Sequence, residues 1–351
     1  MTIEATPIAM ALVGAGPEAD RWARALRGTD HVVLDRIDGG EDAFLATLSR
    51  EGVDAMAFVA PIPDLAGAIK RAVLAGRHVL IAGPEMLSSR QLLALEALAR
   101  RRRRAIVLDG ETLGDEQLAF VRKMTSGANA LWRPRYLRAL RTSVAEDASL
   151  DALALTEIRR VIAVAGGLPA TVSALSPRVD DETGAADVAM VTLSFDAGPV
   201  ARIDVSLLEP AMQQELVVAC DARTIVLRPL DREAPLRIAA GGHRGPKAGA
   251  PWAETIHEHP AAEVLDRITI AAERFIAAVR ARDVAATNLD EAAQAALVWE
   301  CARTSMARGG ERVAMAEGEF RAGRPVLNVI QGGGQTTASG ETPRLTLVGR
   351  G

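Results

Sequence analysis

Two glycines and a small residue follow the first apolar run of the chain, Ile8–Val13, at a spacing that suits phosphate binding. The segment from Gly14 to Ala19 reads Gly-Ala-Gly-Pro-Glu-Ala. Gly14 permits a tight turn, Gly16 lets a phosphate approach the backbone, and the small Ala19 lets the next helix pack closely on the strand. Free N–H groups at that helix N-terminus then face the pyrophosphate. The pattern predicts a dinucleotide site.

Two residues of the same segment weaken this site. Pro17 has no backbone N–H to donate, and Glu18 puts a negative charge where a phosphate would lie. A second interpretation is therefore a turn that is kept for folding alone.

An acid about 20 residues beyond the glycines is expected to bind the ribose hydroxyls of the adenosine. Asp35 and Asp38 both fall in that range, and the sequence leaves the choice between them open. Neither Arg nor Ser follows directly after Asp38, so NAD is favoured and NADP stays an alternative.

Three further acids are candidates for proton transfer. Asp109 and Glu111 lie at the C-terminal end of a predicted strand, and Glu85 follows another. That edge of an α/β sheet is where ligands bind, and a half-buried carboxylate there can act as a general acid or base. In the alternative interpretation, Glu85 and Glu111 cap helices or face solvent.

Two other features suggest binding but have simpler explanations. His257 and His259 alternate in a way that lets two imidazoles converge on a metal ion, yet no third ligand is near in sequence and Pro260 favours a loop. We expect no metal. The five arginines at 100–104 suit the exposed last turn of a helix, whose dipole favours cations.

The elements that must position these residues alternate between strand and helix over the first ~110 residues, which indicates a parallel sheet. The predicted strands are Ile8–Val13, 31–37, 55–60, 78–82 and 105–109; the predicted helices are 18–27, 41–49, 64–75 and 88–103.

The pattern changes further along the chain, where apolar and polar residues alternate as in a sheet with one open face. The predicted strands are 172–179, 188–195, 200–208, 215–220 and 224–228, and the predicted helices are Leu150–Ala165, 261–282 and Leu289–Ala307. We predict a Rossmann dinucleotide-binding domain over residues 1–125, an α+β domain on an open, mainly antiparallel sheet over 126–330, and a flexible tail over 331–351.

Bulk composition excludes several classes of protein. The 351 residues are 49% hydrophobic and 25% charged with a net charge of −4, so nothing attracts the chain to nucleic acid or to a membrane surface. Aromatic residues make up 3%, too few to stack single-stranded bases. The two cysteines are far apart in sequence, which favours buried thiols in a cytoplasmic protein.

Several segments resemble the glucose–fructose oxidoreductase / inositol dehydrogenase / rhizopine-catabolism (Gfo/Idh/MocA) family. In the N-terminal half they are residues 53–61 (Val-Asp-Ala-Met-Ala-Phe-Val-Ala-Pro), residues 74–80 (Leu-Ala-Gly-Arg-His-Val-Leu) and Pro84. Residues 200–208 and 289–313 resemble the second domain of the family. The resemblance covers most of the chain, and the segments occur in the family's order.

The resemblance implies an NAD-dependent oxidoreductase that holds a sugar, cyclitol or related polyol between its domains and forms a homo-oligomer through the second sheet. It also implies that Ala60 and Pro61 line the cofactor site. Three polar residues carry the proton chemistry in the family, namely the Lys of a Glu-Lys-Pro motif and an Asp and a His on the helix Leu150–Ala165. The matching positions here read Gly83, Arg159 and Thr156.

Glycine, arginine and threonine cannot take a hydroxyl proton near neutral pH, so two functions remain open. The chain is either an oxidoreductase with a different acid or base, such as Glu85, Asp109 or Glu111, or a catalytically inactive homologue. The inactive homologue would bind the dinucleotide or another small-molecule effector as a regulatory or scaffold protein, alone or beside an active relative.

Overall fold

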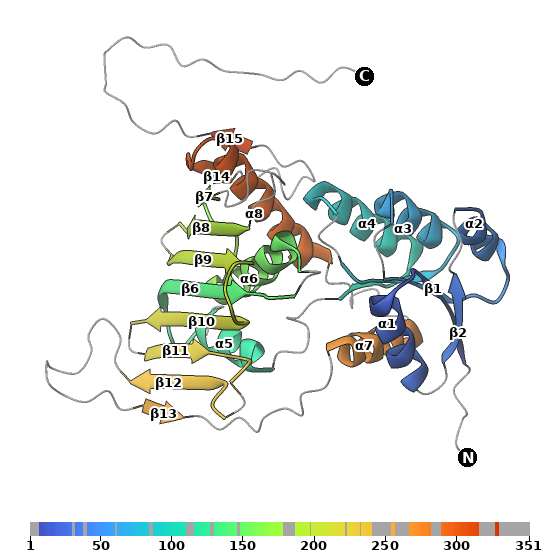
Figure 1. The fold of residues 1–351 in the computed structure, drawn as a ribbon, viewed down its shortest axis with the longest axis horizontal. Coiled ribbons are helices and arrows are strands. Elements are labelled where there is room, and N and C mark those ends of the chain that lie inside the picture. Colours follow the sequence, from blue (N-terminus) through green and yellow to red (C-terminus); the bar gives the residue numbers. More distant parts are fainter. Residues whose placement is uncertain are drawn as a thin grey trace, which may run out of the picture.

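A computed structural model shows the fold of the chain. It describes residues 7–29, 32–37, 41–59, 62–83, 87–109, 116–126, 130–145, 148–177, 187–196, 198–221, 223–231, 233–240, 254–256, 267–281, 289–315 and 327–329. Two layered domains lie side by side, each built on its own sheet (Figure 1).

The first domain carries a five-stranded parallel sheet in the order β2-β1-β3-β4-β5. The strands are β1 (Ile8–Val13), β2 (Val32–Ile37), β3 (Ala55–Phe58), β4 (His78–Ile81) and β5 (Ile106–Leu108). β3, β4 and β5 are buried along their whole length, as parallel strands covered on both faces are. The order reverses between β1 and β3, and doubly wound sheets bind ligands at that switch point.

Helices cover both faces of this sheet. They are α1 (Pro17–Gly28), α2 (Glu41–Ser49), α3 (Leu65–Leu74), α4 (Ser89–Arg102) and α7 (Arg267–Ala281). α1 and α7 pack on one face, where Trp22 and Phe275 are fully buried in one cluster. α2, α3 and α4 contribute to the cluster on the other face. α7 comes late in the sequence, after most strands of the second sheet, but returns to complete the first domain (Figure 1).

Local signals end the helices where the sequence predicts. Ser88 caps α4 in a reciprocal capping box with Gln91, whose side chain accepts from the Ser88 N–H at 2.9 Å. The arginine run lies at the exposed end of α4, as expected. Arg103 ends the helix in the left-handed conformation, and Arg104 Nε donates to the Gly76 carbonyl at 2.5 Å.

The second domain carries a mixed sheet in the order β13-β12-β11-β10-β6-β9-β8-β7-β14-β15. Its strands are β6 (Pro134–Thr142), β7 (Thr171–Leu175), β8 (Val188–Ser194), β9 (Val200–Ser206), β10 (Gln213–Cys220), β11 (Arg223–Leu227), β12 (Leu236–Ala240), β13 (Glu254–Ile256), β14 (Val313–Met315) and β15 (Leu327–Val329). β6 and β9 run parallel, and the other described pairs run antiparallel. The predicted α/β fold class is confirmed.

One face of this sheet is covered by α5 (Glu116–Thr125), α6 (Leu150–Ala165) and α8 (Leu289–Ala307) (Figure 1). Side chains on the other face are more open, as the alternation predicts: Arg138 and Arg202 are about half exposed.

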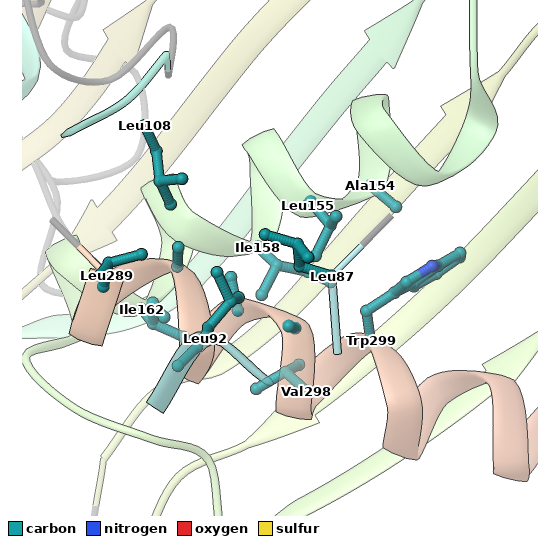
Figure 2. Packing of buried hydrophobic residues seen from close by; sticks show 14 of the residues in the cluster. Leu87, Leu92, Leu108, Ala154, Leu155, Ile158, Ile162, Leu289, Val298 and Trp299 are labelled. Atoms are coloured by element: carbon teal, nitrogen blue, oxygen red, sulfur yellow. The ribbon is translucent and has the colours of Figure 1, made fainter. Parts of the chain in front are cut away.

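The two domains share a continuous apolar core. α8 packs against α4 of the first domain and α6 of the second. Figure 2 shows Leu87 and Leu108 of the first domain in one cluster with Leu155, Ile158 and Val298 of α6 and α8. The end of β5 is thereby held against α6.

Some expectations differ in extent from the structure. The strand predicted over 172–179 ends at Leu175, and the strand predicted over 55–60 ends at Phe58. The short strands β12 to β15 carry too few residues for a clear alternation, and the sequence did not predict them. The predicted tail, 331–351, lies outside the described residues. None of the described helices is long and apolar enough to span a bilayer.

Candidate functional site

The glycine turn after β1 has the backbone that the motif requires. Gly14 has φ 144° and Gly16 has φ 91°, a region that favours glycine. Gly16 is the N-cap of α1 and no side chain caps the helix there. A Cβ built on Gly16 would meet no atom within 4 Å, so the space beside the helix N-terminus is open to a phosphate.

The other residues of the turn leave the space beside the N-terminus of α1 available to a phosphate. Pro17 occupies the first helical turn, where a missing N–H disturbs no bond within the helix. Glu18 pairs with Arg21 at 2.6 Å, which offsets the negative charge that the sequence puts near the phosphates. Ala19 is fully buried in the cluster that joins α1 to the sheet.

The two candidate ribose acids differ in position. Asp35 lies inside β2, in register with Ala11, and its Oδ2 accepts from Arg50 Nη1 at 2.5 Å. β2 ends at Ile37, which pairs with Val13 at the edge where Gly14 follows. Asp38, the residue after Ile37 in sequence, lies outside the described residues.

At the same edge, β4 and β5 end near the second domain. Gly83 follows β4 with φ 77°, which disfavours any side chain and hence the lysine of the resembled motif. Asp109 follows β5, is 6% exposed, and donates its backbone N–H to the Ile81 carbonyl at 2.7 Å. Glu85 and Glu111 lie outside the described residues, as do Ala60 and Pro61.

α6 of the second domain lies against this edge of the parallel sheet, next to the end of β5. Ser149 caps its start by accepting from the Ala152 N–H at 3.4 Å, and Gly166 ends it at φ 86°. Thr156 is partly exposed, whereas Arg159 is buried. Arg159 and Arg160 lie three and four residues beyond Thr156, so the three residues share one side of the helix.

A buried ionic network that the sequence analysis missed lies beneath this helix. Arg160 Nη1 donates to both carboxylate oxygens of Glu157, at 3.0 Å and 2.9 Å, and both side chains are 1% exposed or less. Gln214 Nε2 on β10 donates to Glu157 Oε1 at 3.3 Å. Gln214 stands opposite Arg141 of β6, which is also buried. The signal in sequence was the run Glu-Ile-Arg-Arg inside an otherwise apolar helix.

This network lies at the end of the second sheet that faces the first domain. β6 and β9 point toward the first domain and β10 starts there (Figure 1). Thr142, Ser143 and Ser206 are buried at the same end. Buried polar side chains of the second domain therefore gather opposite the C-terminal edge of the parallel sheet, which is an arrangement typical of functional sites.

Thiol and metal chemistry find no support in the described part of the chain. Burial raises the pKa of Cys220 and of Cys301 to about 12, so neither thiol ionises near neutral pH. The described residues contain no group of three His, Cys, Asp or Glu side chains suited to a metal ion. His257 and His259 lie outside them.

Known proteins are similar to this chain in fold alone. Neither protein-family models nor curated proteins match this chain. Among solved structures, it is similar to an inositol dehydrogenase homologue complexed with NADH and myo-inositol from Azotobacter vinelandii, at 14% identity and a TM-score of 0.71 over 88% of this chain and 98% of that one. GenD2 from gentamicin A biosynthesis in complex with NAD is 18% identical, with a TM-score of 0.68 over 89% and 97%. An oxidoreductase from Pseudomonas syringae is 16% identical, with a TM-score of 0.70 over 88% and 99%.

Proposed function

We propose that this protein is an NAD-dependent oxidoreductase of the Gfo/Idh/MocA type, acting on a hydroxyl group of a sugar, cyclitol or related polyol. The observation that carries the proposal is the uncapped helix N-terminus at Gly16, with positive φ and open space beside it. Structures with this fold bind NAD or NADH, one of them together with myo-inositol.

The residues present fit the cofactor. Gly14 and Gly16 would admit the pyrophosphate to the N-terminus of α1, with Ala19 keeping that helix close to β1. Asp38 is the better candidate for the ribose hydroxyls because Asp35 lies within β2 and is engaged by Arg50. Ala60 and Pro61, after β3, would border the same switch point.

Proton transfer falls to a residue outside the family's usual set. When bound, the nicotinamide supplies the acceptor for hydride from the alcohol. Asp109 is the described acid at this edge, and its burial keeps water away from the reacting group. We propose Asp109 as the group that takes the hydroxyl proton, with Glu85 and Glu111 as the alternatives.

A second function is also tested, because the resemblance aligns Gly83, Thr156 and Arg159 with the Lys, His and Asp of the family. In that case the protein binds the dinucleotide without turnover and serves as a regulatory or scaffold protein. In either case we propose that the open face of the second sheet, with Tyr136 and Val200 exposed, pairs subunits into a homo-oligomer.

Calorimetric titration of the purified protein with NAD⁺, NADH, NADP⁺ and NADPH tests the proposal. Micromolar binding of the NAD pair supports it and justifies a screen of polyols for turnover. Binding without turnover on any polyol favours the regulatory function. Absence of binding by all four nucleotides overturns both.

A further inference from the structure

The arginine run (residues 100–104) puts uncompensated positive charge on the surface at the C-terminal end of α4. The side chains of residues 101–103 are exposed, and none of them forms an ion pair in the described structure. α3 and α4 together hold one acid, Glu96, and Arg100 already pairs with it at 2.6 Å. This charge stands out locally, because the whole chain has a net charge of −4.

The helix end does not need these side chains for capping. The Arg103 N–H donates to the Arg100 carbonyl at 3.3 Å, and the Arg104 N–H donates to the Ala99 carbonyl at 3.0 Å. Arg104 Nε fixes the chain further by donating to the Gly76 carbonyl at 2.5 Å. The main chain and one guanidinium group therefore close the last turn, which leaves the exposed arginines available to another molecule.

The backbone of Arg103 is a second observation that distinguishes this end from an ordinary solvated helix terminus. Arg103 is left-handed at φ 51°, and Asp64 is the one other non-glycine residue of the described structure with a positive φ. Glycine is the usual residue at such a position, because a Cβ strains the left-handed backbone. The chain thus carries a cation where glycine would suit the fold better, and such strain is typical of positions whose side chain has a function.

The arginine run lies at the edge of the parallel sheet away from the proposed cofactor site. α4 ends at this edge and leads into the start of β5, whereas Gly14 and Asp109 follow the ends of β1 and β5. A molecule bound to the arginine run would therefore leave the cofactor edge open.

The geometry of the run selects the class of partner. Successive residues of a helix point about 100° apart, so these guanidinium groups fan out around the helix axis. A flexible acidic chain can wrap such a fan and pair its carboxylates with the guanidinium forks. A flat membrane or a rigid duplex would meet only one side of it. None of the large aromatic side chains described in the first domain is exposed, so nucleic-acid bases would have nothing to stack on.

We propose that the arginine run docks a flexible acidic segment of a partner protein. The interaction is independent of the proposed oxidoreductase activity, since it uses the opposite edge of the sheet.

The test is fluorescence anisotropy of a labelled peptide of alternating Glu and Ser, with a Gln–Ser peptide of the same length as the neutral match. At an ionic strength of about 0.15 M, the acidic peptide should bind at least about tenfold more tightly than the neutral one, as several exposed ion pairs together predict. Equal affinity for the two peptides overturns the inference. Tighter binding of phosphatidylserine vesicles or of a duplex oligonucleotide than of the acidic peptide overturns it in favour of that surface.

A matched pair of double variants locates the effect. Arg101→Gln with Arg102→Gln should weaken binding of the acidic peptide at least about fivefold. Arg24→Gln with Arg27→Gln, which changes two exposed arginines of α1, removes the same charge from the same domain and should leave the affinity nearly unchanged. Equal losses in both variants would mean that overall charge attracts the peptide, which overturns a local docking site.

Arg103→Gly separates docking from folding. The change relieves the left-handed backbone and removes one cation, so the thermal unfolding midpoint should rise while the acidic peptide binds about threefold more weakly. A lower unfolding midpoint would mean that the Arg103 side chain stabilises the helix end, and would overturn its assignment to docking.

Discussion

The carboxylate of Glu300 on α8 accepts two hydrogen bonds from Ser89, the first residue of α4. Its Oε1 accepts from the Ser89 backbone N–H and its Oε2 from the Ser89 hydroxyl, both at 2.8 Å. A negative charge at a helix N-terminus is favourable, and this one is supplied by the other domain. The contact therefore joins the two domains.

We expect Glu300→Ala to lower the free energy of unfolding by about 2 kcal/mol, because it removes two hydrogen bonds to a charged group at the N-terminus of α4. Glu291→Ala on the same helix is the control, since its exposed pair with Arg122 should contribute less than about 1 kcal/mol. Urea titration at pH 7 measures both. Equal losses of unfolding free energy in the two variants would mean that the contact between the domains does not stabilise the fold.

Gly16→Ala should weaken NAD binding by at least about tenfold, since a methyl group would enter the space proposed for the pyrophosphate. Gly52→Ala provides a control with the same strain, because Gly52 has φ 85° and equally open surroundings but lies away from the turn. Calorimetry reports affinity, and thermal unfolding should show a similar small loss of stability in both. Unchanged affinity in Gly16→Ala would contradict the cofactor site.

Gly83→Lys should destabilise the protein by about 1 kcal/mol and create no turnover. The backbone at φ 77° disfavours a side chain, and in the proposed alignment Thr156 and Arg159 would still stand at the His and Asp positions of the resembled family. Thermal unfolding and an NAD-linked polyol assay test both parts. Turnover gained by this single change would show that the lysine was the one missing group.

Asp109→Asn should reduce kcat by at least about 10²-fold if Asp109 takes the hydroxyl proton. Its NAD affinity should stay unchanged, because the residue is proposed to touch substrate and not the dinucleotide. Glu85→Gln and Glu111→Gln, measured beside it, test the alternatives. If kcat is normal in Asp109→Asn but falls in Glu85→Gln or Glu111→Gln, proton transfer is assigned to that glutamate.

Glu215→Gln should lower stability by about 1 kcal/mol near pH 7. Glu215 on β10 is bonded by Arg138 of β6 and Arg228 of β11. Burial opposes its ionisation, but the two arginines outweigh it and hold the pKa of Glu215 below its usual 4.5. A lowered pKa stabilises the folded protein above the unfolded value and loses that effect as pH falls through the folded value.

Urea titrations across pH 7 to 3 test this dependence. The difference between Glu215→Gln and the unmodified protein should shrink only below pH about 4.5 and vanish at the acid end. A difference that stays constant with pH would mean that packing, and not charge, explains the loss.

Local signals made the first half of the fold predictable. β1 and α2 have the predicted bounds because an apolar run or a helical period is read within a few residues. The turn at Gly14 and Gly16 was predicted because its positive φ values require glycine. α6 has the predicted bounds, and in the structure a Ser149 cap and the left-handed Gly166 set them.

Tertiary structure alone decided how these elements meet. Glu157 and Arg160 are spaced like a surface ion pair of a helix, and only packing against Gln214, 57 residues away, makes them a buried network. The return of α7 to the first domain and the insertion of β6 between β10 and β9 are also non-local. The spacing of apolar residues determines whether one segment forms a helix or a strand. Burial and charge at the site depend instead on which elements, distant in sequence, pack into the same core.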